Sequence, residues 1–298
     1  MNLENKNYSK LALGTAQFGM DYGLTNKSGK VHNDAAQDIL NLAYENGINT
    51  IDTAIAYGDS EATLGRIGVT SWQVITKLPA VPINVSDIFE WVKLQTTESK
   101  KRLGVDRLYG ILLHRPSQLL DGSRGVDLYR GLSYLKEIGS VEKIGISIYS
   151  PDELDCLNGY FNFDLLQTPL NLLDRRIIAS GWLRDLKDRG IEIHARSIFL
   201  QGLLLITSDQ RQNKFDRWSE IWSIYDDWIS ESKISRLEAC LAYVLSNPDI
   251  DKVVIGMESV MHLAEILDAA KKNLKNYPEN LSVKDEKLLN PSKWSTLT

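Results

Sequence analysis

The chain has 298 residues, of which 43% are hydrophobic and 24% charged, and its formal net charge is −5 at pH 7. This composition is typical of a globular protein with a large core, and the length allows one α/β barrel or two average domains. The acidic balance and the absence of a basic block argue against nucleic acid and against anionic membranes as partners.

The N-terminal segment is polar, and no apolar run is long enough to span a membrane. We therefore expect neither a signal peptide nor a membrane anchor, and a cytoplasmic location. The two cysteines, Cys156 and Cys240, lie in segments with helical patterns and lack metal-binding spacing. We expect both to be buried free thiols in a reducing compartment, and we expect no metal site.

Short apolar runs alternate with amphipathic stretches along the chain. The predicted strands cover residues 10–16, 48–54, 72–78, 108–114, 143–149, 163–169, 191–199 and 252–257. Strands that alternate with helices form parallel sheets, and eight such strands can close into a barrel. A doubly wound sheet is the alternative, but its G-x-G-x-x-G phosphate fingerprint is absent. We therefore expect an α/β fold of the (β/α)8 TIM-barrel type, as a single domain over residues 1–298.

Two segments interrupt this alternation. Residues 202–232 follow the seventh predicted strand, are too long for a simple connection and contain three tryptophans. We expect an extra helical hairpin whose tryptophans belong to the core. The alternative is a functional loop, because long loops after barrel strands build the active face and Trp side chains can stack on a sugar or an aromatic ring. The tail, residues 271–298, has weak periodicity and is expected to wrap the barrel.

Four titratable side chains lie where three neighbouring predicted strands end. Asp52 ends the second strand, and Tyr57 lies in the loop just after it. Lys77 ends the third strand and His114 the fourth. Each has a structural explanation by itself, as a cap, a rim aromatic, a surface charge or a core histidine. Because the carboxyl ends of parallel barrel strands meet at one rim, their convergence predicts an active site. Ser60 is expected to be the N-cap of the helix that follows.

Seven sequence motifs occur in order along residues 8–270. They are GTAQFG, IDTAIAYGDSEATLG, ITKLP, LLHRP, GISIYS, LQTPLNLLDRR and IGMESV. In these motifs the chain resembles the aldo-keto reductase superfamily, whose catalytic tetrad of Asp, Tyr, Lys and His lies on a (β/α)8 barrel. The resemblance implies a nicotinamide-dependent oxidoreductase that reduces the carbonyl group of a small aldehyde or ketone to an alcohol.

The resemblance also implies a role for each member of the tetrad. Tyr57 is the proton donor, and Lys77 beside it is expected to lower its pKa from the free value of about 10. Asp52 keeps Lys77 charged and oriented, and His114 hydrogen-bonds the carbonyl oxygen of the substrate. The cofactor, NAD(H) or NADP(H), supplies the hydride, while the protein supplies position and electrostatics.

Further positions match the part of the family that binds the cofactor. Ser147 and Gln167 correspond to residues that hydrogen-bond the nicotinamide carboxamide, although Ile148 replaces a usual asparagine. Arg196 stands where the family often has an aromatic residue, so that it either stacks on the nicotinamide or binds an acidic substrate or a cofactor phosphate. Ser197 matches the pyrophosphate region. The full implied set is Gly14, Thr15, Asp52, Ser147, Gln167, Arg196, Ser197, Gly256, Glu258, Ser259 and His262.

The choice between the two nicotinamides depends on the segment from 255 to 267. NADP-dependent members usually bind the 2′-phosphate through basic side chains there, but IGMESVMHLAEIL contains neither lysine nor arginine. Glu258 would repel the phosphate and could accept hydrogen bonds from the ribose hydroxyls of NAD. Alternatively, Glu258 points to solvent and Arg196 or another basic group reaches the phosphate.

Two other functions are compatible with the sequence. Some members of the superfamily bind nicotinamides but serve as regulatory or sensor subunits with little turnover. An unrelated barrel lyase or isomerase could also use an Asp, Lys and His site. The substrate is left open by the sequence, and so is the oligomeric state. A faint likeness of RSIFLQGLLL to bacterial relatives in surface-polysaccharide metabolism favours a sugar-like carbonyl compound.

Overall fold

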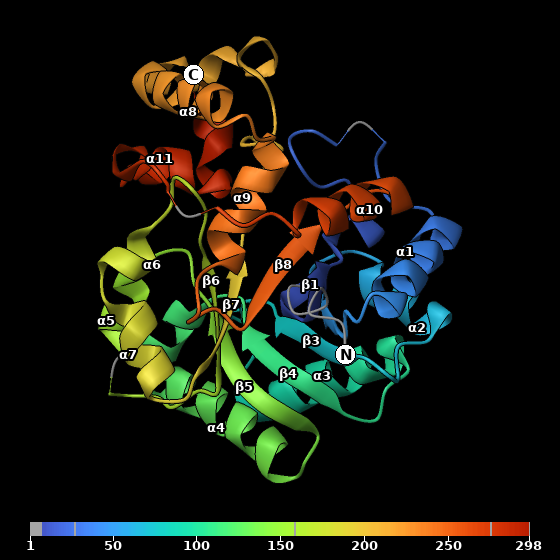
Figure 1. Ribbon diagram of the computed structural model, residues 1–298. Helices are drawn as coiled ribbons and strands as arrows, with labels where there is room; N and C mark the ends of the chain where they lie inside the picture. Colours follow the sequence, from blue (N-terminus) through green and yellow to red (C-terminus); the bar gives the residue numbers. More distant parts are fainter. Residues whose placement is uncertain (1–7, 27, 158, 275, 298) are drawn as a thin grey trace.

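The computed structural model describes residues 8–26, 28–157, 159–274 and 276–297, and they contain a closed barrel of eight parallel strands (Figure 1). The strands are β1 (Leu11–Gly14), β2 (Thr50–Asp52), β3 (Gln73–Leu78), β4 (Leu108–Leu113), β5 (Val141–Ser147), β6 (Leu165–Pro169), β7 (Glu192–Arg196) and β8 (Lys252–Gly256). Each strand pairs with the next, and β8 closes the barrel on β1. The TIM-barrel prediction is confirmed. The single domain over residues 1–298 stays a prediction, and residues 1–7 and 298 lie outside the described part.

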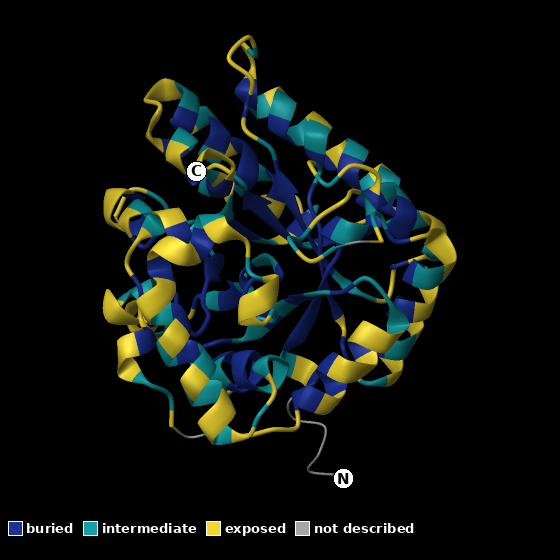
Figure 2. Cartoon of the chain, turned by 90° about the horizontal axis from the view of Figure 1, so that it is seen from above, coloured by how far each residue is buried: buried dark blue, intermediate teal, exposed yellow. Residues whose placement is uncertain are grey.

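Helices surround the barrel on its outside (Figures 1 and 2). They are α1 (Asn33–Glu45), α2 (Ser60–Ile67), α3 (Ile88–Leu103), α4 (Ser123–Glu137), α5 (Asp152–Leu157), α6 (Arg176–Ala179), α7 (Trp182–Asp188), α8 (Ser219–Ser232), α9 (Arg236–Leu245), α10 (Val260–Ala269) and α11 (Glu286–Leu289). Short 3-10 helices are Tyr8–Lys10, Ala16–Phe18, Pro116–Leu120, Leu200–Gly202, Ser208–Gln210, Asn213–Trp218, Glu279–Leu281 and Pro291–Thr296. In the described residues, no helix is both long and apolar enough to cross a membrane.

The main core lies between the strands and the helices around them. Seen from above, buried strands occupy the centre, and the helices present one buried and one exposed face (Figure 2). Ile39 on α1, Leu64 on α2 and Val92 on α3 are fully buried there. Because an amphipathic helix buries one apolar stripe, these contacts fix the strands, and with them the rim where the strands end.

The segment after β7 and the tail form a second core. Trp218 and Trp222 are buried in it and Trp228 is partly buried, which confirms that the tryptophans pack rather than line a site. The segment is not the predicted hairpin, because 3-10 turns precede a single long helix, α8. Figure 1 shows α8 and α11 together above the carboxyl ends of the strands on the β6 to β8 side.

The tail packs into this second core, and the two cysteines differ in their exposure. Trp294 in the tail is buried in the second core, and the Val283 backbone N–H donates to the Leu173 carbonyl at 2.8 Å. The tail therefore packs on one side of the barrel end rather than around the barrel. Cys240 is a buried free thiol as predicted, but Cys156 is exposed, because it lies on the solvent face of the short helix α5.

Candidate active site

Tyr57 is held by a turn after β2 that packs against the loop after β1. Its backbone N–H donates to the Ala54 carbonyl at 3.0 Å, and its carbonyl accepts from the Ser60 N–H at 3.0 Å. A Cβ on Gly19 would lie 1.7 Å from the Tyr57 carbonyl oxygen, and one on Gly58 would lie 2.4 Å from the Gly19 carbonyl oxygen. Gly58 also has a φ of 53°. Only glycine fits at both positions, so the two glycines bring the loops together and fix Tyr57.

Ser60 contributes to the same junction in an unpredicted way. It is the first residue of α2, and Asp59 precedes the helix, so Ser60 is not the N-cap. Its buried hydroxyl donates to the Thr15 carbonyl at 2.8 Å and lies 3.0 Å from the Thr53 hydroxyl. The side chain therefore ties the β1 and β2 loops to each other instead of capping the helix.

A buried ion pair lies on the inner side of this loop. Lys77 Nζ lies 2.7 Å from Asp52 Oδ2, and it also donates to the Thr53 carbonyl at 2.9 Å. The other carboxylate oxygen, Oδ1, accepts from the Gln167 amide at 2.7 Å. Burial lowers the pKa of Lys77, and the Asp52 carboxylate works against that shift. The lysine is 1% exposed, so its charge depends on this carboxylate.

The two other members of the predicted tetrad lie next to the ion pair. The rings of Tyr57 and His114 approach edge to face with centroids 5.9 Å apart, and Lys77 Nζ lies 5.1 Å from the Tyr57 ring centroid. Burial, together with the charges of Lys77 and Arg196, lowers the pKa of His114 to about 4. The imidazole is therefore neutral at pH 7 and can donate one hydrogen bond.

The pKa of Tyr57 shifts in the opposite direction to the sequence prediction. Burial raises it, the Asp52 carboxylate raises it further, and the Arg196 guanidinium works against both. The prediction of a lowered pKa was wrong because Asp52 neutralises the charge of Lys77 and because the phenol itself is enclosed. At neutral pH the hydroxyl consequently keeps its proton.

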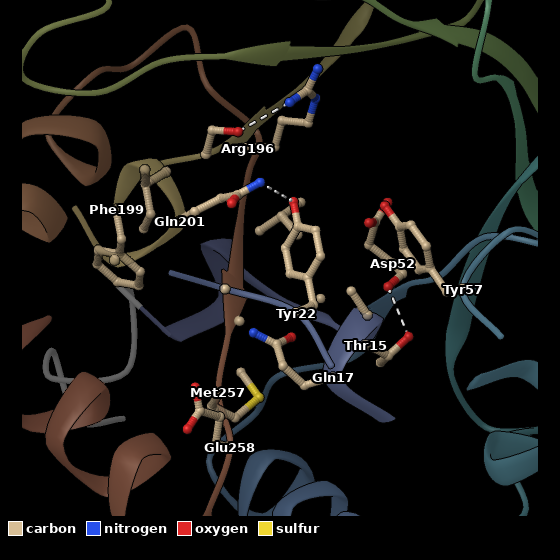
Figure 3. Close-up of a pocket in the computed structure, with 18 of the residues that line it drawn as sticks. Thr15, Gln17, Tyr22, Asp52, Tyr57, Arg196, Phe199, Gln201, Met257 and Glu258 are labelled. Atoms are coloured by element: carbon tan, nitrogen blue, oxygen red, sulfur yellow. Dashed lines mark hydrogen bonds between the residues drawn. The ribbon is translucent and has the colours of Figure 1, made fainter. Parts of the chain in front are cut away.

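These groups open on a cavity of about 600 Å³ at the carboxyl end of the barrel (Figure 3). Asp52, Tyr57 and His114 line its wall, whereas Lys77 lies behind Asp52 and does not. The cavity extends to Glu258 after β8. Figure 3 shows Glu258 and Tyr57 on different sides of the cavity. It thus connects the candidate catalytic groups with the start of α10.

Most residues predicted to bind a cofactor line this same cavity. They are Gly14, Thr15, Asp52, Ser147, Gln167, Arg196, Ser197, Gly256, Glu258 and His262. The exception is Ser259, which instead caps α10 by accepting a hydrogen bond from the His262 backbone N–H. The Ser147 hydroxyl donates to the Gln167 side-chain carbonyl at 3.1 Å, so these two residues form one polar unit.

Other lining residues were not predicted, among them Gln17, Tyr22, Tyr149, Phe199 and Gln201. Tyr149 could have been found, because it lies two residues after Ser147 and strand alternation puts both on one face. Tyr22 belongs to the loop after β1, which has no periodic pattern. It reaches the cavity because Gln201 donates to its hydroxyl at 3.3 Å and the Leu24 N–H donates to the Gln201 carbonyl at 2.9 Å.

Comparison with known proteins gives matches throughout this barrel. The family described as "Aldo/keto reductase family" matches residues 10–279. An aldo-keto reductase of Mycolicibacterium vanbaalenii is 37% identical over 134 residues, which cover 42% of this chain and 44% of the relative. Aldo-keto reductase YhdN of Bacillus subtilis is 25% identical over 208 residues, covering 66% and 60% of the two chains. The matches thus span from less than half to about three fifths of these relatives.

A solved structure extends the likeness to the fold. Aldo-keto reductase AKR11C1 from Bacillus halodurans, in its holo form, superposes with a TM-score of 0.70 at 18% identity, covering 89% of this chain and 88% of that one. At this identity the likeness supports the barrel architecture. The family match over residues 10–279 carries more weight, because it contains every strand and the four residues at the rim. The chain belongs to the aldo/keto reductase family.

Proposed function

We propose that this protein is a nicotinamide-dependent carbonyl reductase in which Tyr57 donates the proton. One observation carries the proposal: a buried Lys77–Asp52 ion pair lies behind a tyrosine and a neutral histidine on the wall of a cavity. The substrate is a small aldehyde or ketone. The sugar-like class that the sequence favoured stays a prediction.

The cofactor of this family is NAD(H) or NADP(H), and the polar groups of the cavity fit its carboxamide. One N–H of the Gln167 side-chain amide donates to Asp52, and its carbonyl oxygen accepts one hydrogen bond from the Ser147 hydroxyl. It therefore keeps one donor and one acceptor for a planar amide. Ser147 and Gln167 would hold the carboxamide, and Ser197 together with the backbone after β7 would lie at the phosphates. When bound, the reduced nicotinamide supplies the hydride.

Tyr57 and His114 then act on the carbonyl oxygen. The Tyr57 hydroxyl is protonated at neutral pH and has no hydrogen-bond partner within the described part of the chain, so its proton is available to a substrate. His114 is neutral and donates a second hydrogen bond to the same oxygen. Two neutral donors aimed at one oxygen stabilise the negative charge that develops there as the hydride arrives.

Lys77 and Asp52 act on Tyr57 after the proton has left. A phenolate near Lys77 gains from the ammonium, whose Nζ lies 5.1 Å from the ring centroid. Asp52 keeps that ammonium charged in an enclosed site, where burial alone would favour its neutral form. The pair therefore lowers the free energy of the state that follows proton transfer, although the resting phenol is a weak acid.

The test is consumption of NADH and NADPH by the purified protein with benzaldehyde and D-glyceraldehyde. Saturable nucleotide binding followed by turnover of at least one aldehyde is the expected result. Saturable binding without turnover of these two aldehydes or of their carboxylate- or phosphate-bearing counterparts would contradict the proposal and point to a sensor. No binding of either nicotinamide would contradict a nicotinamide enzyme altogether.

We also propose that the protein prefers NADH to NADPH. Glu258 lines the cavity just before α10 begins, and Glu265 lines it from within that helix. In the described lining of this cavity, the segment from 255 to 267 contributes two carboxylates and no lysine or arginine. Carboxylates repel a 2′-phosphate but accept hydrogen bonds from ribose hydroxyls.

The substitution Glu258→Arg tests this preference. We expect kcat/KM to shift from NADH toward NADPH by about 1–3 kcal/mol, the scale of a charge-assisted hydrogen bond gained. Glu258→Gln is the matched control, because it removes the repulsion without adding a cation and should give a smaller shift. An unchanged ratio in both variants would remove Glu258 from the ribose site.

A further inference from the structure

Arg196 is held rigidly at the same rim as the candidate catalytic groups. It is the last residue of β7 and lines the cavity. Its Nη2 donates to the Ile148 carbonyl at 2.8 Å, and its Nη1 donates to the Ser197 hydroxyl at 3.0 Å. One face of the guanidinium lies over Tyr149, with Cζ 4.6 Å from the ring centroid. These contacts preorganise the side chain, so little rotamer entropy remains to be lost on binding a ligand.

Among the described residues, the charge of Arg196 has no counter-ion. Within the described residues, no carboxylate lies within 4.0 Å of its guanidinium, whereas the neighbouring Lys77 is neutralised by Asp52. The charge of Arg196 affects the pKa values of the candidate catalytic groups Tyr57 and His114. Burial is the main cause of the raised pKa of Tyr57 and of the lowered pKa of His114, and Arg196 opposes the first shift and adds to the second. The reacting end of the cavity therefore carries one unneutralised positive charge.

The charges of the cavity are separated in space. Arg196 is the one lysine or arginine among the described lining residues, while the carboxylates of Glu258 and Glu265 belong to the β8–α10 end. Figure 3 shows Arg196 and Glu258 on opposite sides of the cavity with Tyr22 between them. An anionic group is repelled from one end and attracted to the other, next to Tyr57 and His114.

Strand alternation places Arg196 one tier above the groups that fit a carboxamide. Gln167 is paired in register with His194, and Arg196 lies two residues further along β7 on the same face. Likewise Tyr149 lies two residues beyond Ser147. Arg196 and Tyr149, which pack on each other, thus lie beyond Ser147 and Gln167 in the direction of the carboxyl ends of the strands.

We propose that Arg196 binds an oxyanion, a carboxylate or a phosphate, carried by the carbonyl substrate itself. This inference rests on the proposed reductase function and narrows its substrate class to anionic aldehydes or ketones. A guanidinium presents a planar fork of N–H donors that matches the two oxygens of such a group. Two of its five N–H donors are used by Ile148 and Ser197, so three remain for the substrate.

Matched substrate pairs test the proposal and separate its two oxyanions. The first pair is 4-carboxybenzaldehyde and benzaldehyde, and the second is D-glyceraldehyde 3-phosphate and D-glyceraldehyde. For the wild type we expect kcat/KM to be higher for the anionic member of at least one pair. In Arg196→Met the ratio of anionic to neutral kcat/KM should fall about ten- to a hundred-fold for that pair. In Arg196→Lys this ratio should fall by less, because lysine keeps the positive charge but lacks the planar fork of N–H donors.

Arg115 provides the control. It is exposed, does not line the cavity and also lowers the pKa of His114 through its charge, although less than burial, Lys77 and Arg196 do. Arg115→Met should leave the anionic-to-neutral ratio within about two-fold of the wild type, as expected for an exposed, solvent-screened charge. An equal fall in Arg115→Met and Arg196→Met would overturn the proposal in favour of general electrostatics.

Two further results would overturn it while leaving the reductase function intact. One is a wild type that reduces the neutral aldehydes and shows no preference for either anionic partner. The other is an Arg196→Met variant with an unchanged ratio but weakened NADH binding, measured by fluorescence titration, which would assign the guanidinium to the cofactor. Failure to reduce all four substrates despite NADH binding would instead contradict the reductase function itself.

Discussion

The barrel carries the same four kinds of side chain at both of its ends. At the amino ends of the strands, Tyr109, Lys143, Glu192 and His194 form a cluster that we call the lower cluster. The Tyr109 hydroxyl donates to the Glu192 carboxylate at 2.7 Å, and His194 Nε2 lies 2.6 Å from the other carboxylate oxygen. Lys143 bonds both to Glu192 and, at 2.8 Å, to the Tyr109 hydroxyl. Apart from a glutamate in the place of the aspartate, the residue types do not distinguish this cluster from the candidate active site.

The lower cluster and the candidate active site differ in whether the tyrosine hydroxyl is still available to bind a ligand. In the lower cluster, the tyrosine hydroxyl is hydrogen-bonded to Glu192 and Lys143, and Tyr109 packs against the buried cluster of Ile75, Leu112 and Leu165. None of the four residues lines the large cavity. At the upper rim, Tyr57 faces that cavity with a hydroxyl that has no partner within the described residues. A site therefore requires an unsatisfied donor on an accessible wall, and the lower cluster is structural by this criterion.

The largest expected contrast concerns the two lysines. Lys77→Met should abolish carbonyl reduction, because Asp52 is left as a buried unpaired carboxylate and Tyr57 loses its ammonium. Lys143→Met should keep kcat and lower the free energy of unfolding by about 1–3 kcal/mol, the cost of hydrogen bonds to a charged group. Steady-state kinetics and urea unfolding of both variants measure the contrast.

Asp52→Asn refines this first comparison. We expect a smaller loss of kcat than in Lys77→Met, because the ammonium can persist without its counter-ion. The pH–rate profiles of the two variants should differ accordingly, with reduction by Asp52→Asn failing at a lower pH than in the wild type as Lys77 loses its proton. Small and equal losses in both would mean that the pair is structural, like the lower cluster.

The second contrast concerns the two tyrosines. Tyr57→Phe should lower kcat by about 10²–10⁴, the usual contribution of a general acid, while NADH affinity barely changes. Tyr109→Phe should leave kcat unchanged and lower the free energy of unfolding by about 1–3 kcal/mol, because it removes a hydrogen bond to a carboxylate. Turnover of Tyr57→Phe above a tenth of the wild-type value would show that Tyr57 is not the donor.

Sequence reasoning succeeded where one strand end decides the position of one residue. Apolar runs that end in Asp52, Lys77 or His114 place these side chains at one rim, whatever the details of packing. It failed where several elements act together. The pKa of Tyr57 depends on burial and on Asp52, and the two opposed the effect expected of Lys77. Tyr22 enters the cavity from a loop without periodicity.

The lower cluster shows the same limit. Tyr109 and Glu192 are 83 residues apart in sequence, and only the closure of the barrel brings their strands into one cluster. Each strand gives its own polar positions, such as Glu192 and His194 two residues apart on β7, but not their partners on other strands. The Tyr109–Glu192 hydrogen bond could not be predicted because the strand pattern gives the face of a residue but not its partner across the barrel.

The last and smallest contrast concerns acid stability, where the two ends should respond in different pH ranges. Burial alone would raise the pKa of Glu192, but hydrogen bonds from His194 and Lys143 lower it to about 2. A carboxylate with a depressed folded pKa stabilises the protein above its unfolded pKa of about 4.3, and this contribution is lost as the pH falls toward 2. At the upper rim, His114 has a folded pKa of about 4. The unfolded chain takes up a proton at that histidine below about pH 6.5 and the folded chain does not, so the fold loses stability between pH 6.5 and 4.

We therefore expect Glu192→Gln to be less stable than the wild type at pH 6, by on the order of 2 kcal/mol because solvent screens part of the carboxylate. This deficit should shrink between pH 4.3 and 2, where the wild type itself loses the contribution. His114→Gln should instead lose less stability than the wild type between pH 6.5 and 4, and the same amount below pH 4, since the proton uptake that penalises the wild-type fold is absent. Free energies of urea unfolding at each pH unit from 7 down to 2 measure both variants. A deficit of Glu192→Gln that stays constant from pH 6 to pH 2 would mean that Lys143 and His194 do not hold the carboxylate ionised. A His114→Gln profile parallel to the wild type would mean that the pKa of His114 is the same in the folded and the unfolded chain, near 6.5, so that burial does not keep the imidazole neutral below that pH.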